Sequence, residues 1–193
     1  YAARLAVGVE GVGIAERAYQ GALAYALDRR QGRSVWTGEA SSPIFDHPDV
    51  RRSLAVMKAK ISAARAICLL TGVAADMAEH AADETDRRRW KAREDLFTPI
   101  AKAWSTDVGV EVASAGLQVH GGMGFIEETG AAQHYRDAKI LTIYEGTTAI
   151  QANDLVGRKT VRDGGATAKS ILAQVRATEA ALGEVQGADF AAI

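Results

Sequence analysis

Glu145 is the side chain in this sequence with the clearest potential for acid–base chemistry. It follows an apolar, strand-like run and precedes a turn of small residues that opens a helix, Ile-Leu-Thr-Ile-Tyr-Glu-Gly-Thr-Thr (140–148). The positive end of the helix dipole favours its carboxylate, whereas desolvation by Ile143 and Tyr144 favours the uncharged acid. A carboxylate under both influences can act as a base once a substrate excludes water. Spacing alone, however, favours a helix-capping glutamate without chemistry.

A second unusual stretch is Gln-Val-His-Gly-Gly-Met-Gly (118–124), in which three of four consecutive positions are glycine. Glycines interrupt a helix and let backbone amides approach a ligand closely. A third glycine group, Gly8, Gly11 and Gly13, has the order G-x-x-G-x-G with no preceding strand, so it does not fit a dinucleotide fingerprint. For these three we expect close helix packing.

Composition excludes several classes of protein. The 193 residues contain 23 Lys and Arg against 24 Asp and Glu, and this net charge of −1 gives no pull toward nucleic acid or anionic lipid. Cys68 is the single cysteine, so no intrachain disulfide forms. We find no signal peptide or membrane span and expect a soluble, cytoplasmic protein. Because the chain begins at Tyr1 without an initiator Met, we expect a piece of a longer protein.

The elements that must position these residues are helices. Alanine is abundant, proline is scarce and alternating β-branched residues are almost absent, which favours an all-α fold. Four long helices with short connections predict an antiparallel up-down four-helix bundle with short extra helices and a C-terminal helical extension. Apolar spacing and glycine or proline breaks predict helices over about 2–30, 48–80, a third stretch that contains Thr98-Pro99 and ends near Leu117, 130–138, 147–161, and from about Ala168 to Val185.

Two polar patterns in these helices invite interpretations that we reject. A helical bundle can hold two irons, but such sites need Glu-x-x-His pairs, and neither His80 nor His134 has a Glu three residues earlier. We therefore expect no metal site. The run Arg87-Arg88-Arg89 is surrounded by acidic residues and has no aromatic platform, so a solvated turn fits it better than a nucleic-acid surface.

Four motifs together resemble the acyl-CoA dehydrogenase family. In chain order they are Ala-Leu-Asp-Arg-Arg-Gln-Gly (26–32), His-Gly-Gly-Met-Gly-Phe (120–125), Tyr-Arg-Asp-Ala-Lys-Ile (135–140) and Tyr-Glu-Gly-Thr-Thr-Ala-Ile-Gln (144–151). The resemblance covers the family's C-terminal α-helical domain, here residues 1–163. The stretch after Gln151 is most similar to the longer branch that includes the 3-methylmercaptopropionyl-CoA dehydrogenases. Residues 164–193 are then a helical extension or a linker to a missing C-terminal region.

The resemblance implies a reaction. Family members use FAD to dehydrogenate an acyl-CoA thioester to the 2-enoyl-CoA and pass the electrons to electron-transfer flavoprotein. Glu145 matches the family's catalytic base, which removes the α-proton. An acyl-CoA oxidase that uses oxygen, and a non-catalytic bundle that only forms oligomers, remain as alternatives.

The resemblance also implies binding residues. Gly146 lies beside the substrate and Arg4 near its CoA moiety, while Thr147 and Ala149 contact the flavin nucleotide. Arg29 and the stretch Gln118, Val119, His120, Gly121 and Gly122 match positions that bind the FAD of a partner subunit. Two departures are Gln31-Gly32, one residue shorter than the common loop, and Asp46-His47-Pro48, where many relatives have Glu-His-Gln.

The family's N-terminal helical domain and middle β domain have no counterpart in these 193 residues. Because the flavin ring of family members lies between the middle domain and the bundle, we expect the isolated chain to be inactive and largely free of FAD. The family assembles as dimers or tetramers through this domain, and we expect the apolar faces of the bundle to drive the same homo-oligomerisation.

Overall fold

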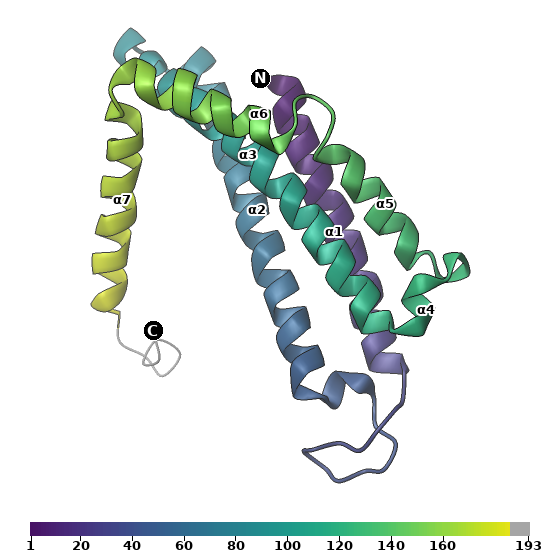
Figure 1. Cartoon of the computed structure of the whole chain (residues 1–193). Coiled ribbons are helices and arrows are strands. Elements are labelled where there is room, and N and C mark those ends of the chain that lie inside the picture. Colours follow the sequence, from purple (N-terminus) through teal and green to yellow (C-terminus); the bar gives the residue numbers. More distant parts are fainter. Residues whose placement is uncertain (186–193) are drawn as a thin grey trace.

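The computed structural model describes residues 1–185, and three long helices dominate it (Figure 1). They are α1 (Ala2–Asp28), α2 (Pro48–His80) and α3 (Glu84–His120), and each runs antiparallel to the one before it. Proline at the first position of α2 fits its missing N–H, and the Asp83 side chain caps α3 by accepting from Asp86 N at 2.8 Å. The expectation of a solvated turn at Arg87-Arg88-Arg89 is therefore wrong, because these residues lie in the first turns of α3.

Shorter elements complete the bundle. Helix α5 (Ala131–Leu141) runs antiparallel to α3 and packs against α1 and α3, which makes it the fourth member (Figure 1). The residues described contain no strand, only an isolated antiparallel bridge between Arg30 and Pro43. The predicted all-α, up-down four-helix bundle is confirmed. The remaining elements are η1 (Ile44–Asp46), α4 (Gly122–Phe125), η2 (Glu127–Thr129), α6 (Thr148–Asn153), the π-helical η3 (Asp154–Thr160), η4 (Val161–Asp163) and α7 (Ala166–Gly183).

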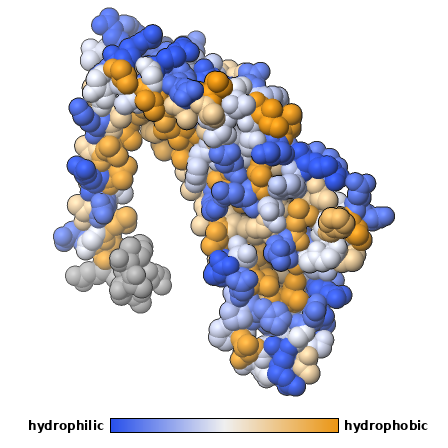
Figure 2. Space-filling view, viewed as in Figure 1, coloured by the Kyte–Doolittle hydropathy of each residue, from blue (hydrophilic) through white to orange (hydrophobic). Residues whose placement is uncertain are grey.

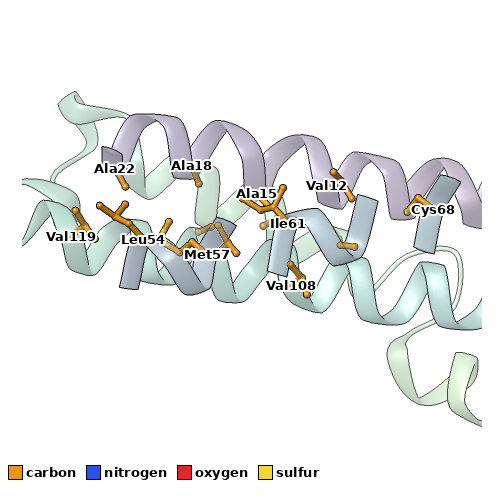
Figure 3. Packing of buried hydrophobic residues seen from close by; sticks show 14 of the residues in the cluster. Val12, Ala15, Ala18, Ala22, Leu54, Met57, Ile61, Cys68, Val108 and Val119 are labelled. Carbon is orange, nitrogen blue, oxygen red and sulfur yellow. The ribbon is translucent and has the colours of Figure 1, made fainter. Parts of the chain in front are cut away.

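The bundle core is made of small side chains on α1 and larger ones on α2 and α3 (Figure 3). Figure 3 shows part of this core, in which Ala15, Ala18 and Ala22 of α1 pack with residues of the other two helices. These are Leu54, Met57 and Ile61 of α2 and Val108 of α3. Small residues let α1 approach the backbone of α3 closely. A Cβ on Gly8 would lie 2.8 Å from Ala101 O, and one on Gly11 would lie 2.7 Å from Ser105 O.

Three expectations from the sequence, one about packing and two about secondary structure, need correction. Close packing is confirmed for Gly8 and Gly11, but a Cβ on Gly13 would meet no atom within 4 Å. The third helix continues past Leu117 to His120, because no residue before Gly121 departs from helical geometry. The run before Glu145 is not strand-like, since Ile140 and Leu141 end α5 and the next residues form a turn and then a bend.

Helix α7 stands apart from the bundle, on the side where α2 lies (Figure 1). Its hydrophobic side chains gather on the side that faces the bundle (Figure 2). They line a groove of about 790 Å³ together with Leu70, Val73, Trp90 and Phe97. The predicted helical extension is thus present from Ala166 to Gly183, and the part of that prediction that concerns 186–193 lies outside the described residues.

Helix α2 corrects the expectation that no segment of this sequence could span a membrane. Within the described residues it is one helix that is long and apolar enough to do so. A core helix of a soluble protein meets the same criterion, so the finding is weak evidence for a membrane. Its Leu54, Met57 and Ile61 are buried in the bundle core.

Candidate functional site

The residues predicted to act in catalysis or binding form two groups at opposite ends of the bundle (Figure 1). Glu145 lies in the turn between α5 and α6, beside the first turn of α1 and the middle of α3. The glycine stretch lies where α3 ends and α4 begins, beside the end of α1. Along α3, Lys102 in the middle of the helix and His120 at its C-terminal end are about 27 Å apart at 1.5 Å per residue.

Glu145 has an unusual backbone conformation. Its φ of 53° makes it the one non-glycine residue with positive φ in the part of the chain described here. The left-handed region costs an L-residue roughly 1–2 kcal/mol, and such strain persists only where neighbouring groups hold it. The Glu145 side chain is exposed and forms no hydrogen bond or ion pair with another described residue. Its carboxylate is therefore available to a ligand.

The helix that follows is capped by Thr147 and not by Glu145. Thr147 Oγ1 accepts from Ile150 N at 3.4 Å, and the neighbouring Thr148 hydroxyl donates to Asp107 on α3 at 3.2 Å. The interpretation of Glu145 as a helix cap is wrong, because Thr147 occupies that position. Thr147 and Ala149 are exposed on the first turn of α6.

Within this chain, the apolar neighbours of Glu145 do not remove it from water. Ile143 is 51% exposed and Tyr144 is 38% exposed, so the expected desolvation is not present here. The Tyr144 hydroxyl instead donates to Glu10 on α1. This hydrogen bond, with burial and the nearby carboxylates, raises the pKa of Tyr144 to about 12, so the hydroxyl stays protonated.

Two buried side chains hold the backbone around Glu145. Gln151 Nε2 donates to the carbonyls of Glu145 and Gly146 at 3.2 and 3.1 Å. Lys102 Nζ, from α3, donates to Gly146 O at 2.7 Å. Gly146 has a φ of 87°, and a Cβ there would lie 2.7 Å from Gln151 Nε2, so both conformation and space require glycine.

Arg4 joins this network from the start of α1. Its Nη1 donates to Asp154 Oδ2 at 2.7 Å and to Gln151 Oε1 at 3.1 Å. Burial alone would raise the pKa of Asp154, but the hydrogen bond and charge of Arg4, with Lys159 and Arg158, hold it below its usual range. The Asp154 carboxylate thus fixes Arg4, and Arg4 orients the amide that holds the Glu145 turn.

The opposite end is built mainly from backbone. Gly121 ends α3 with φ 58° and ψ −138°, a conformation that favours glycine. Gln118, Val119 and His120 belong to the last turn of α3 and not to a loop, so the expected loop is shorter than 118–122. Val119 is buried in the core, whereas His120 stacks on Tyr25 with ring centroids 4.5 Å apart.

Arg29 lies at this same end, just past the last residue of α1, and is exposed. A cavity of about 310 Å³ opens beside the end of α3 and is lined in part by Arg17, His120 and His134. Burial lowers the pKa of His134 below its ordinary value, and the charge of Arg17 adds to this effect. Within residues 1–185, no group of three or more His, Cys, Asp or Glu side chains could hold a metal ion.

Comparison with known proteins identifies the family. The sequence model of the acyl-CoA dehydrogenase C-terminal domain matches residues 1–159. This chain belongs to the acyl-CoA dehydrogenase family. The 3-methylmercaptopropionyl-CoA dehydrogenase of Ruegeria pomeroyi is 55% identical over 181 residues, which are 93% of this chain and 31% of that protein. A butyryl-CoA dehydrogenase of Syntrophomonas wolfei is 36% identical over 89% of this chain and 28% of its own length.

A solved structure of an acyl-CoA dehydrogenase has the same helical fold. The butyryl-CoA dehydrogenase of Megasphaera elsdenii superimposes with a TM-score of 0.60 and 30% identity, over 80% of this chain and 35% of that one. The chain thus spans about a third of the length of the relatives it matches.

The residues present fit the FAD that acyl-CoA dehydrogenases use. A Cβ on Gly121 or Gly122 would meet no atom within 4 Å, so open space lies beside this backbone. The Arg29 guanidinium forms no ion pair with any residue between 1 and 185, which leaves it available to a phosphate. At the other end, Thr147 and Ala149 present an exposed helix start.

Three residues of the Glu145 network escaped the sequence interpretation: Lys102, Gln151 and Asp154. Lysine in a long helix is usually solvated, and nothing in its neighbours along the chain marks Lys102 as buried. One signal is the spacing of Thr98, Lys102 and Thr106, which repeats every four residues and places these polar side chains on one face of α3. All three are buried.

Proposed function

We propose that this domain supplies the catalytic base of an FAD-dependent acyl-CoA dehydrogenase that converts an acyl-CoA thioester to the 2-enoyl-CoA. The observation that carries the proposal is the state of Glu145. Its carboxylate is exposed and unpaired among the described residues, while its backbone is strained and held by buried polar side chains. A helix cap would need neither feature.

Glu145 accepts the α-proton of the thioester, whose carbonyl makes that proton acidic. When bound, FAD supplies the acceptor for the hydride that leaves the β-carbon. The two electrons of the α-carbon–hydrogen bond then form the new double bond, so the reaction balances. A positioned base of this kind contributes roughly 10²- to 10⁴-fold to the rate.

The two ends of the bundle have different parts in binding. Thr147 and Ala149 bind the flavin nucleotide beside Glu145, and Gly146 lies against the substrate. Arg29 and the stretch 118–122 bind the nucleotide end of a partner subunit's FAD. The separation of about 27 Å along α3 supports this division, because the two groups do not face one pocket on one chain. We therefore propose a homo-oligomer, either a dimer or a tetramer.

Arg4 is proposed to lie near the CoA moiety. Its ion pair with Asp154 limits which part of the guanidinium a CoA phosphate can reach. Only 24% of the Arg4 side chain is exposed. A CoA phosphate would approach the exposed part of the guanidinium while Nη1 stays on Asp154. Arg4 then has two functions, since it also orients Gln151.

We propose electron-transfer flavoprotein as the electron acceptor and the cytoplasm as the location. Among thioesters, 3-methylmercaptopropionyl-CoA is the first to test, because the 55% identical relative is named for it. Butyryl-CoA follows for the same reason. Turnover with dye or electron-transfer flavoprotein, without oxygen consumption, separates a dehydrogenase from an oxidase.

The 193-residue chain alone is proposed to be inactive and largely free of FAD. Ile143 and Ile150, on either side of Glu145, are more than half exposed, so this chain alone does not enclose a flavin ring. The absorbance spectrum of the purified chain tests this. Stoichiometric flavin would contradict it.

Glu145→Gln in the full-length protein that contains this domain tests the proposed function. We expect substrate-dependent bleaching of the flavin to fall roughly 10³-fold while FAD stays bound. Glu128→Gln, at an exposed carboxylate in η2, is the matched control and should bleach normally. Loss of FAD from the Glu145 variant would show that this residue is structural, and normal bleaching would show that the base is another group.

A further inference from the structure

The backbone of Glu145 needs an external restraint. A left-handed glutamate in an exposed turn returns to an ordinary conformation unless other groups fix the peptides on either side. In this turn the restraint acts on two consecutive carbonyls, those of Glu145 and Gly146. The question is which side chain of the scaffold fixes them to the bundle.

Gln151 is not sufficient for this, because it belongs to the same local segment as Glu145. It lies on α6, five residues after Gly146, and is connected to α1 through the side chain of Arg4. Lys102 is different, since it comes from the middle of α3, the longest helix, and reaches Gly146 O at 2.7 Å from 44 residues away in the sequence. Among the described contacts, this bond ties the Glu145–Gly146 pair directly to a rigid element.

Lys102 is costly for the fold. Its side chain is fully buried, and no carboxylate of residues 1–185 lies within 4 Å of Nζ. Burial lowers the pKa of Lys102, while the charges of Asp107 and Glu145 oppose this effect. A buried cation without an ion pair is unfavourable, and a methionine would fill the same space without that penalty. Packing alone therefore does not explain a lysine here, and the hydrogen bond that it donates is the one to Gly146 O.

We propose that Lys102 is a positioning residue for the base: its ammonium fixes the Gly146 carbonyl, keeps Glu145 in its left-handed conformation, and places a positive charge beside the carboxylate. The proposal rests on the proposed function of Glu145. The charge of Glu145 opposes the effect of burial on the pKa of Lys102, so the ammonium and the carboxylate attract each other across this turn.

A purely structural lysine predicts something different. It would tie α3 to the turn, so its loss would lower stability and leave the chemistry of any folded enzyme unchanged. A positioning lysine changes kcat more than KM and moves the pH profile. The two can be separated in variants that still fold.

The kinetic test compares Lys102→Met, Lys102→Gln and Lys60→Met in the full-length enzyme. Lys60 is a partly exposed lysine on α2 that pairs with Glu111, so its variant removes the same charge away from the turn. We expect Lys102→Met to lower kcat roughly 10- to 100-fold with little change in KM. The pH at which activity appears should rise. Lys102→Gln keeps a donor but no charge, so it should recover part of kcat and none of the pH shift.

A second measurement needs no flavin and no activity. Gly146–Thr147 is the one Gly-Thr pair in the 193-residue sequence, so carbonyl-¹³C glycine with ¹⁵N threonine isolates the Gly146 carbonyl resonance. In the unmodified chain this resonance should titrate with Lys102, at a pH below the ordinary lysine value of 10.5. Lys102→Met should shift the resonance upfield and abolish the titration, and Lys60→Met should do neither.

The outcomes are distinct. Unchanged kcat and pH profile in Lys102→Met, or a Gly146 resonance insensitive to Lys102, would overturn the proposal. If Lys102→Met does not fold, kcat and the pH profile of Lys102→Gln decide between a positioning and a structural lysine, and the titration in the unmodified chain shows whether Lys102 holds the Gly146 carbonyl. An active Glu145→Gln enzyme would remove the proposed base, yet a Gly146 resonance that follows Lys102 would still show the restraint on the turn.

Discussion

The two ends of the bundle hold their functional residues by different physical means. At the Glu145 end, Lys102 of α3 and Gln151 of α6 donate to two backbone carbonyls, and Arg4 of α1 donates to Gln151. At the glycine end, the geometry comes from backbone contacts, with Gly121 in a glycine-favouring conformation and a Tyr25–His120 stack beside it. The first end depends on charges and hydrogen bonds, and the second depends on the absence of side chains.

This difference agrees with what each end is proposed to do. A base must be fixed to within a fraction of an ångström of a reacting proton, which favours a buried polar network. A nucleotide can be bound by exposed backbone and one flexible arginine, which favours open glycines. The two ends should therefore fail under different changes.

The largest effect on stability should come from Asp154→Ala at the Glu145 end. It leaves the partly buried guanidinium of Arg4 without its carboxylate and lowers the free energy of unfolding by about 3 kcal/mol. Asp49→Ala breaks an exposed ion pair with Arg52 and should change this free energy by less than about 0.5 kcal/mol. Urea unfolding of both variants provides the measurement, and equal effects would contradict a special role for the buried pair.

Gly124→Ala should give the next largest effect, at the glycine end. A Cβ at this position would lie 2.5 Å from Leu117 O, a backbone atom that cannot move aside, so we expect a loss of about 2 kcal/mol. Gly122→Ala is the matched control, because its Cβ would meet nothing within 4 Å. Hydrogen exchange should show the loosening around 117–130 and not around Glu145. A loss of protection at both ends would mean that they are not independent.

The smallest effect should be a difference in pH dependence. The pKa of His134 is lowered by burial first and then by Arg17, with Asp137 opposing and His120 adding, so the unfolded chain binds the proton more readily. Protonation of His134 therefore does not reduce the free energy of unfolding above pH 6.5. This free energy falls as the pH drops from 6.5 through the lower pKa of His134 in the folded state. For Asp154, whose folded pKa is also lowered, the loss starts only below pH 3.8.

Acidification from pH 7 to 5 should therefore loosen the glycine end while the Glu145 end stays protected. Hydrogen exchange, corrected for its intrinsic pH dependence, measures this directly. His134→Gln should remove the change between pH 7 and 5. Equal loosening of both ends over this range would show that the two pH windows are assigned wrongly.

The sequence was sufficient to predict the helices, because apolar spacing and glycine or proline breaks act locally. Along α2 the apolar residues recur every three or four positions from Val50 to Cys68, and all of them are buried except Val50, which is partly buried. The glycine motif marked the end of α3 only approximately, since three more residues stay helical before Gly121. Val9 fits the apolar stripe of α1 yet is 53% exposed, because periodicity does not show where a packing partner ends.

The network around Glu145 could not be predicted from the sequence for a physical reason. Arg4 and Asp154 lie 150 residues apart, and Lys102 and Gly146 lie 44 apart, so only the folded bundle brings them together. Periodicity describes which face of a helix is apolar, but it does not show which single polar residue on that face points inward. The motifs around Glu145 identified the reacting residue without its supports.

Exchange of the substrate α-proton with solvent tests the central claim most directly, because it follows the base without the hydride step. With an acyl-CoA analogue that cannot be dehydrogenated, the full-length enzyme should exchange this proton for deuterium. Glu145→Gln should retain FAD and exchange roughly 10³-fold more slowly, whereas Arg29→Gln should bind FAD more weakly and exchange normally once FAD is in excess. Exchange at the unmodified rate in Glu145→Gln would contradict the assignment of chemistry to this end of the bundle.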